Sequence, residues 1–122
     1  MTARILVVDD NAMMREVLRI HLSEAGYEVE QAEDAIKAGH SVLERTPDLI
    51  ICDVNMPHMT GFEFVSALKS DKSIPNVPVI FLSSYDDGHA QGMNAGAQLY
   101  LVKPIVKEKL LQAVETHLGR KG

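Results

Sequence analysis

The sequence has a single cysteine, no long apolar run and no excess of basic residues. Cys52 alone cannot form an internal disulfide, and one cysteine is typical of a reducing compartment. No apolar run is long enough to cross a bilayer, and the amino terminus lacks a secretory signal pattern. The net charge of -5 gives no basic surface for a phosphate backbone. We therefore expect a cytoplasmic protein that neither enters a membrane nor binds nucleic acid directly.

The composition is that of a folded domain. Hydrophobic residues make up 46% of the 122 positions and charged residues 24%, which is ordinary globular usage. A chain of this length can bury a core without disulfides, and it shows no internal repeat, linker or low-complexity tract. The five histidines show no spacing typical of metal ligands. Residues 1–122 are thus predicted to form one domain.

Apolar runs typical of strands alternate with helical patterns along the whole chain. The predicted strands are 4–8, 27–31, 49–52, 77–82 and 98–102. Four predicted helices begin after the candidate caps Asn11, Asp34, Thr60, and either Ser84 or Asp86. A fifth predicted helix spans 106–118. Their inward faces are predicted from three- and four-residue spacings at Met14, Val17, Leu18, Leu22, Ile36, Ala38, Val42, Leu43, Leu110, Leu111, Val114 and Leu118.

Five strand–helix pairs with short connections require right-handed crossovers. Such alternation predicts an α/β fold, (βα)5, with a doubly wound five-stranded parallel sheet between two helical layers. Parallel strands place all their carboxyl ends at one edge of the sheet, where open α/β sheets bind their ligands. Residues that follow the strands should therefore meet.

Polar side chains follow four of these predicted strands. Asp9 and Asp10 follow the first strand, Asp53 the third, Ser83 the fourth and Lys103 the fifth. Carboxylates that converge repel one another, and Mg²⁺, which prefers oxygen ligands, is the natural compensation. A carboxylate is also a nucleophile toward phosphorus. We assign that role to Asp53, which stands alone at the middle of the edge, and the metal to the Asp9–Asp10 pair. In isolation each of these residues would be interpreted as part of a turn or as a cap, but together they indicate one shared site.

Taken together, these residues resemble the receiver domain of two-component response regulators over essentially the whole chain. The motifs are Asp9-Asp10, Asp53 with Asn55-Met56-Pro57 and Gly61, Ser83, Tyr100, and Lys103-Pro104. The resemblance implies the flavodoxin-like strand order 2-1-3-4-5 and phosphorylation of Asp53 by a histidine kinase or phosphotransfer protein. It also implies that Asp10, Asp53 and the backbone carbonyl of Asn55 bind Mg²⁺, with Asp9 acting through water.

The same resemblance implies a switch. Lys103 would pair with a phosphoryl oxygen and form a cis bond to Pro104. The Ser83 hydroxyl would move to the phosphoryl group, and Tyr100 would turn inward. The output surface toward an effector protein would be the fourth helix, the fifth strand and the fifth helix. Gly88 and Gly92 should weaken that fourth helix by roughly 1 kcal/mol each relative to alanine.

Three other functions are compatible with parts of this pattern. A small phosphohydrolase or phosphotransferase could use Asp53 as its nucleophile, but haloacid-dehalogenase-like enzymes carry a second aspartate where this chain has Asn55. A flavodoxin-like cofactor binder needs a hydroxyl- and glycine-rich loop after the first strand to bind phosphate, and this chain has Asp9-Asp10-Asn11 there. A pseudo-receiver that only binds partners would not need Asp53, Ser83 and Lys103. The chain is compatible with a stand-alone chemotaxis-type or phosphorelay regulator and with part of a longer protein.

Overall fold

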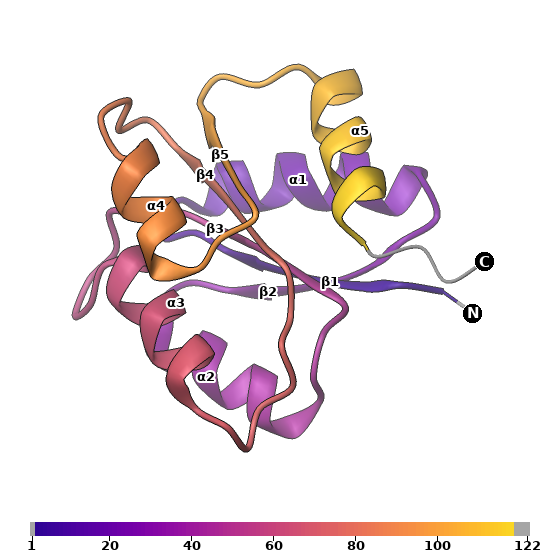
Figure 1. Cartoon of the computed structure of the whole chain (residues 1–122). Coiled ribbons are helices and arrows are strands. Elements are labelled where there is room, and N and C mark those ends of the chain that lie inside the picture. Colours follow the sequence, from indigo (N-terminus) through magenta and orange to yellow (C-terminus); the bar gives the residue numbers. More distant parts are fainter. Residues whose placement is uncertain (1, 119–122) are drawn as a thin grey trace.

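The computed structural model describes residues 2–118 and contains one five-stranded parallel sheet (Figure 1). Its strand order is β2-β1-β3-β4-β5, as the resemblance implies. The strands are β1 (Arg4–Val8), β2 (Glu28–Ala32), β3 (Leu49–Cys52), β4 (Val79–Ser83) and β5 (Leu99–Val102). Strand β1 pairs with both β2 and β3, for example Val8 with Ala32 and with Cys52. The predicted fold class is confirmed.

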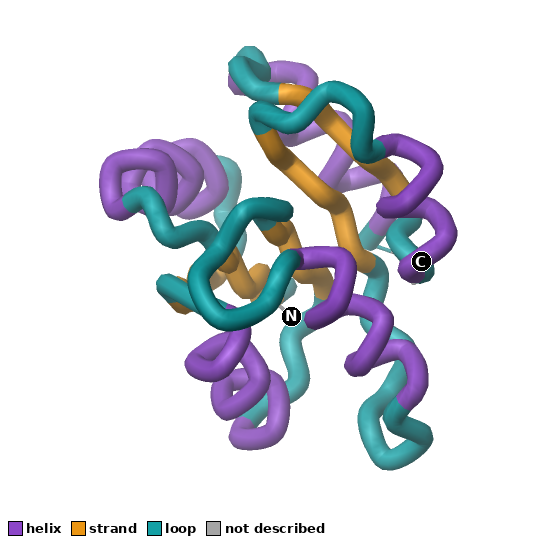
Figure 2. The backbone as a smooth tube through the Cα atoms, turned by 90° about the vertical axis from the view of Figure 1, so that its left-hand side faces the viewer, coloured by secondary structure: helices purple, strands orange, loops and turns teal. Residues whose placement is uncertain are grey.

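Helices cover both faces of the sheet (Figures 1 and 2). They are α1 (Ala12–Glu24), α2 (Ala35–Glu44), α3 (Gly61–Ser70), α4 (His89–Ala95) and α5 (Lys107–His117). Successive strand residues point to opposite faces, so Ile5 and Val7 pack with α1 and α5, while Leu6 and Val8 pack with the other three helices. None of the helices within residues 2–118 is long and apolar enough to cross a membrane.

Three helices begin at the predicted caps. The side chains of Asn11, Asp34 and Thr60 each accept a hydrogen bond from the backbone N–H three residues later. Thr60 and Glu63 form the full capping box. These signals were readable from sequence because capping involves only neighbouring residues.

Several expected details are wrong. Helix α4 begins only at His89, after Gly88, so neither Ser84 nor Asp86 caps it, and it has no side-chain cap hydrogen bond. The predicted bounds of β2, β4 and β5 are shifted by one or two residues. Three apolar residues expected in the core are exposed, because each lies on the outer side of a helix whose buried stripe is narrow: Val17, Ile36 and Leu43.

Candidate functional site: an acidic cluster at the sheet edge

The acidic cluster lies where two adjacent central strands end. Asp9 directly follows β1, and Asp53 directly follows β3. Sheet-like hydrogen bonds continue past both strands, because the Asp53 N–H donates to the Val8 carbonyl at 2.9 Å and the Asp9 N–H to the Ala32 carbonyl at 3.1 Å. These bonds hold both aspartates in register with the rigid sheet.

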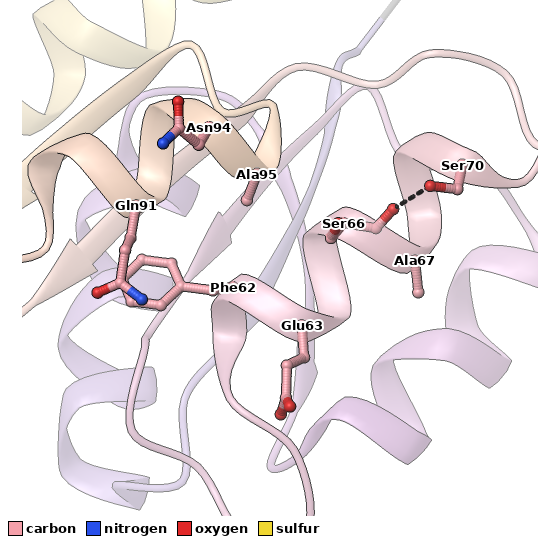
Figure 3. Close-up of a pocket in the computed structure, with 8 residues that line it drawn as sticks. All are labelled: Phe62, Glu63, Ser66, Ala67, Ser70, Gln91, Asn94 and Ala95. Atoms are coloured by element: carbon pink, nitrogen blue, oxygen red, sulfur yellow. Dashed lines mark hydrogen bonds between the residues drawn. The ribbon is translucent and has the colours of Figure 1, made fainter.

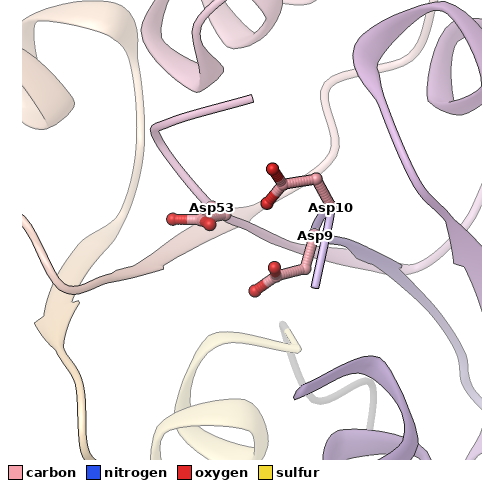
Figure 4. A group of neighbouring side chains, drawn as sticks. All are labelled: Asp9, Asp10 and Asp53. Atoms are coloured by element: carbon pink, nitrogen blue, oxygen red, sulfur yellow. The ribbon is translucent and has the colours of Figure 1, made fainter. Parts of the chain in front are cut away.

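The three predicted carboxylates meet at this edge. One ligand oxygen from each of Asp9, Asp10 and Asp53 lies within 4.8 Å of the others (Figure 4). Asp9 is 2% exposed and Asp53 8%, whereas Asp10 is open to solvent. The parallel topology therefore joins residues that are more than 40 positions apart in sequence.

Lys103 is the cation of the cluster. Its Nζ lies 2.9 Å from Asp9 Oδ2 and 3.5 Å from Asp53 Oδ2. It follows β5, and its backbone N–H donates to the Ser83 carbonyl at 2.7 Å. The peptide bond from Lys103 to Pro104 is cis, as expected. One ammonium thus pairs with two of the three carboxylates.

Burial and like charge both act on Asp53. Burial raises the pKa of its carboxyl, and the neighbouring Asp9 raises it further, while Lys103, the Val54 N–H and the Ser83 hydroxyl oppose the rise. The pKa of Lys103 is also raised: burial alone would lower it, but its contacts with Asp9 and Asp53 outweigh burial. The folded protein therefore holds a carboxylate that is costly to ionise beside an ammonium that stays charged.

Asp9 is held by two hydrogen bonds that the sequence did not predict. Its Oδ1 accepts the Asn11 N–H at 2.9 Å, and its backbone carbonyl accepts a hydrogen bond from Arg15 Nη1 at 2.6 Å. The only sequence signal for Arg15 is its place one turn after Asn11 on α1, where a side chain can reach back to the strand end. Asp9 is thus rigid.

The loop after Asp53 is closed tightly at both ends. The Val54 N–H donates to Asp53 Oδ1 at 2.7 Å, and the Gly61 N–H donates to the Val54 carbonyl at 2.8 Å. A Cβ on Gly61 would lie 2.1 Å from the Asp53 carbonyl oxygen, so only glycine fits there. Asn55 is exposed in this loop. Its predicted role as a carbonyl ligand stays a prediction.

Ser83 and Tyr100 lie beside the cluster. Ser83 is fully buried, and its Oγ accepts the Tyr85 N–H at 3.1 Å. Tyr100 occupies an inward position, 6% exposed, and its hydroxyl donates to the Tyr85 carbonyl. Burial raises the pKa of Tyr100, and a Ser83 hydrogen bond opposes that rise. The two residues predicted to form the switch are therefore joined through Tyr85.

The donor set suits Mg²⁺. The group contains carboxylate oxygens and no histidine or cysteine ligand, which favours a hard ion over zinc. Asp10 is open to solvent, which leaves room for the waters that Mg²⁺ keeps. Cys52, next to Asp53, is fully buried and its pKa is raised well above the ordinary thiol value by burial, so it is packed as a hydrophobic residue.

A separate groove of about 530 Å³ runs between α3 and α4 (Figure 3). Phe62, Ser66 and Ser70 line it from α3, and Gln91 and Asn94 from α4. The Ser70 hydroxyl donates to the Ser66 carbonyl at 2.9 Å. None of the acidic residues of the cluster lines this groove, so the candidate chemistry does not reside there.

Comparison with known proteins agrees with this geometry. Residues 5–115 match the family model described as response regulator receiver domain. The chain is 36% identical over 120 residues to the phosphate regulon transcriptional regulatory protein PhoB of Pseudomonas aeruginosa, covering 97% of this chain and 52% of that protein. The chain thus spans about half the length of the curated relatives it matches.

Solved structures show the same fold. Chemotaxis response regulator CheY4 of Vibrio cholerae aligns with a TM-score of 0.88 and 37% identity, over 95% of this chain and 98% of that one. Response regulator TrrA of Thermotoga maritima, solved in complex with Mg(2+)-BeF, aligns with a TM-score of 0.86 and 32% identity, over 94% of this chain and 98% of that one. The chain therefore belongs to the response regulator receiver domain family of two-component signalling.

Proposed function

We propose that residues 1–122 form one receiver domain that accepts a phosphoryl group on Asp53 from a histidine kinase or a histidine phosphotransfer protein. The convergence of Asp9, Asp10 and Asp53 around the Lys103 ammonium carries this proposal. Phosphoryl transfer needs mainly positioning and charge neutralisation, and both are supplied by groups fixed to strand ends. The reaction takes place in the cytoplasm.

The chemistry is an in-line displacement. An Asp53 carboxylate oxygen attacks phosphorus, the bond from phosphorus to the donor histidine nitrogen breaks, and an aspartyl phosphate results. Asp10, Asp53 and the Asn55 carbonyl, with Asp9 nearby, would hold Mg²⁺, which would supply neutralisation of the charge on the transferred group. Lys103, already 3.5 Å from Asp53 Oδ2, pairs with a phosphoryl oxygen. The protein does not act as an enzyme on a separate substrate.

The residues beside the acidic cluster connect it to the surface that would bind an effector protein. Ser83 lies between Asp53 and the loop that carries Tyr85, so its hydroxyl is placed to bond a phosphoryl oxygen. A change there reaches Tyr100 and the surface of α4, β5 and α5. Apolar side chains are exposed on α4 at Met93, on β5 at Val102 and directly before α5 at Val106, as expected where a protein effector binds.

A small-molecule phosphohydrolase that uses Asp53 is the second candidate, and no observation favours it. Asn55 stands where such an enzyme would need an acid, and the groove between α3 and α4 contains none of the acidic cluster. A pseudo-receiver is disfavoured by the placement of Asp53, Ser83 and Lys103 at one edge.

The direct test is treatment with a small acyl-phosphate donor and Mg²⁺, followed by intact mass measurement. We expect one labile phosphoryl adduct, lost with Asp53→Asn and with chelation of Mg²⁺. Asp87→Asn is the matched control, because Asp87 is exposed in the loop after β4 and outside the cluster. An adduct that persists in Asp53→Asn, or no adduct with any donor, contradicts the proposal. Rapid turnover of a phosphorylated metabolite would favour the enzyme.

A further inference from the structure

The Tyr100 side chain lies in an aromatic cage. Its ring centroid is 5.9 Å from that of Phe81, 6.4 Å from Phe62 and 6.2 Å from His89. Phe62 and Phe81 also contact each other edge to face at 5.3 Å. These rings come from α3, β4 and the first residue of α4, so they surround the tyrosine from three elements.

The remaining wall of the cage is backbone. Gly88 and Gly92 lie one turn apart, and the Gly92 N–H donates to the Gly88 carbonyl at 2.8 Å. A Cβ on Gly88 would lie 2.4 Å from Tyr100 Oη, and one on Gly92 would lie 2.8 Å from Tyr100 Cδ2. Real Cβ atoms do not approach other atoms so closely. The tyrosine ring therefore fills the space that side chains at both positions would need.

The backbone does not explain these glycines. Gly88 has φ -91°, which any residue adopts. Gly96, at the end of α4, differs because its φ of 110° itself favours glycine. Glycine inside a helix also weakens the helix. Space for Tyr100 is the physical reason that remains for Gly88 and Gly92.

We propose that Gly88 and Gly92 form a slot in α4 that holds Tyr100 inward, and that the slot sets how readily the Ser83 side of the phosphorylation site responds. The link is short: Tyr100 donates to the Tyr85 carbonyl, and the Tyr85 N–H donates to Ser83 Oγ. The slot itself rests on packing alone, whereas its link to phosphorylation rests on the proposed function.

The test of the slot is a double-mutant cycle between Gly92→Ala and Tyr100→Ala, read by thermal unfolding. With Tyr100 present, alanine at 92 clashes, and we expect the melting temperature to fall by about 3 °C or more. Without the tyrosine ring, that clash is removed and the approach to Phe81 Cδ2 at 3.1 Å remains, so the same alanine should lower the melting temperature by much less. Gly39→Ala in α2 is the matched control, because a Cβ there meets nothing within 4 Å, and it should stabilise both backgrounds equally.

Ring NMR signals give a second measurement. The chain has three tyrosines, and the signal lost in Tyr100→Ala belongs to Tyr100. We expect Gly92→Ala, and not Gly39→Ala, to move that signal toward the value of an exposed ring. An additive cycle or an unmoved Tyr100 signal would overturn the slot.

The link to the site is measured with the acyl-phosphate donor. We expect Gly92→Ala to lower the initial rate of adduct formation severalfold and Gly39→Ala to leave it unchanged. An unchanged rate in Gly92→Ala would overturn the link. No adduct in the unmodified chain would instead contradict the proposed function, and the cycle and ring signals would still decide the slot.

Discussion

The two ends of β1 both bury charge, and they differ in how that charge is balanced. At the amino end, the 6% exposed Arg4 donates through Nη1 to the Arg45 carbonyl at 3.0 Å and pairs through Nη2 with Glu30. Its Nε lies 3.8 Å from Glu28, and its backbone N–H donates to Asp48 at 2.7 Å. At the carboxyl end, Asp9, Asp10 and Asp53 lie close together, and Lys103 pairs with two of them, Asp9 and Asp53. The buried charge of Arg4 is balanced by other protein groups, so we expect it to contribute to the stability of the fold.

Where the protein leaves buried charge in excess, the remainder is available to a ligand. The acidic cluster is poised to gain stability from a cation and to change when a dianionic group is added. The amino end has no such capacity, because its charges already have partners. The comparison predicts that substitutions at the amino end act on stability, while those at the carboxyl end act on binding and chemistry.

The largest expected effect is at the amino end. Arg4→Met removes a buried guanidinium that bonds the Arg45 carbonyl and pairs with Glu28 and Glu30, and losing these charge-assisted hydrogen bonds should cost about 2 kcal/mol. Denaturant unfolding should show this loss, while the folded fraction keeps phosphorylation. The control is Arg45→Met, since Arg45 is 65% exposed and should cost less than about 1 kcal/mol. Equal losses in the two variants would show that the burial of Arg4 adds nothing to the stability of the amino end.

The next effect is the response to Mg²⁺. An ion that binds only the folded cluster stabilises it by about 1.4 kcal/mol at tenfold excess over its dissociation constant. Thermal unfolding with and without Mg²⁺ measures this gain. It should vanish in Asp10→Asn and persist in Asp48→Asn, where the carboxylate belongs to the amino end. A gain that survives Asp10→Asn would place the ion elsewhere.

Asp53→Asn should stabilise the fold although it removes the proposed site of phosphorylation. The pKa of Asp53 is raised from its ordinary value of 3.8, first by burial and then by Asp9, so the folded state binds this proton more tightly than the unfolded chain. Stability should therefore fall as pH rises through the interval between the ordinary and the raised pKa, and the cost is complete above it. Asparagine avoids that cost.

We expect Asp53→Asn to unfold at a higher temperature than the unmodified chain at pH 7 without Mg²⁺, and to lose this part of the pH dependence. Melting temperatures of Asp53→Asn and of the unmodified chain, measured from pH 4 to 8, test this prediction. A less stable Asp53→Asn across that range would show that the Val54 and Lys103 contacts outweigh burial and repulsion.

The smallest effect is at His58, in the loop that follows Asp53. Its φ of 75° is in the left-handed region, which costs non-glycine residues about 1 kcal/mol. His58→Gly relieves this strain but adds freedom to the unfolded chain, so the expected gain is about 0.5 kcal/mol. Denaturant unfolding measures it, with His40→Gly in the middle of α2 as a control of opposite sign.

The sequence predicted the sheet and the cluster because both depend on simple patterns. Alternation of strands and helices requires a parallel sheet, and a parallel sheet brings Asp9, Asp53 and Lys103 to one edge. Caps at Asn11, Asp34 and Thr60 were readable because they are local.

What the sequence did not show depends on contacts between distant residues. The start of α4 at His89, the reach of Arg15 to the Asp9 carbonyl, and the space that Gly92 leaves for Tyr100 each require knowing what lies opposite in the fold. The exposure of Leu43 likewise depends on the width of the buried stripe of α2. The functions of Asn55 and Ser83 stay predictions, because they describe a state with a bound phosphoryl group.

The closed loop between Asp53 and Gly61 also limits how this chain can be changed. Its first residue is fixed by the sheet, and its last packs against the Asp53 backbone so closely that no side chain fits. An inserted or deleted residue between 54 and 60 would therefore have to displace either Asp53 or the start of α3. For fusion, tagging or circular permutation, the length of this segment should therefore be left as it is.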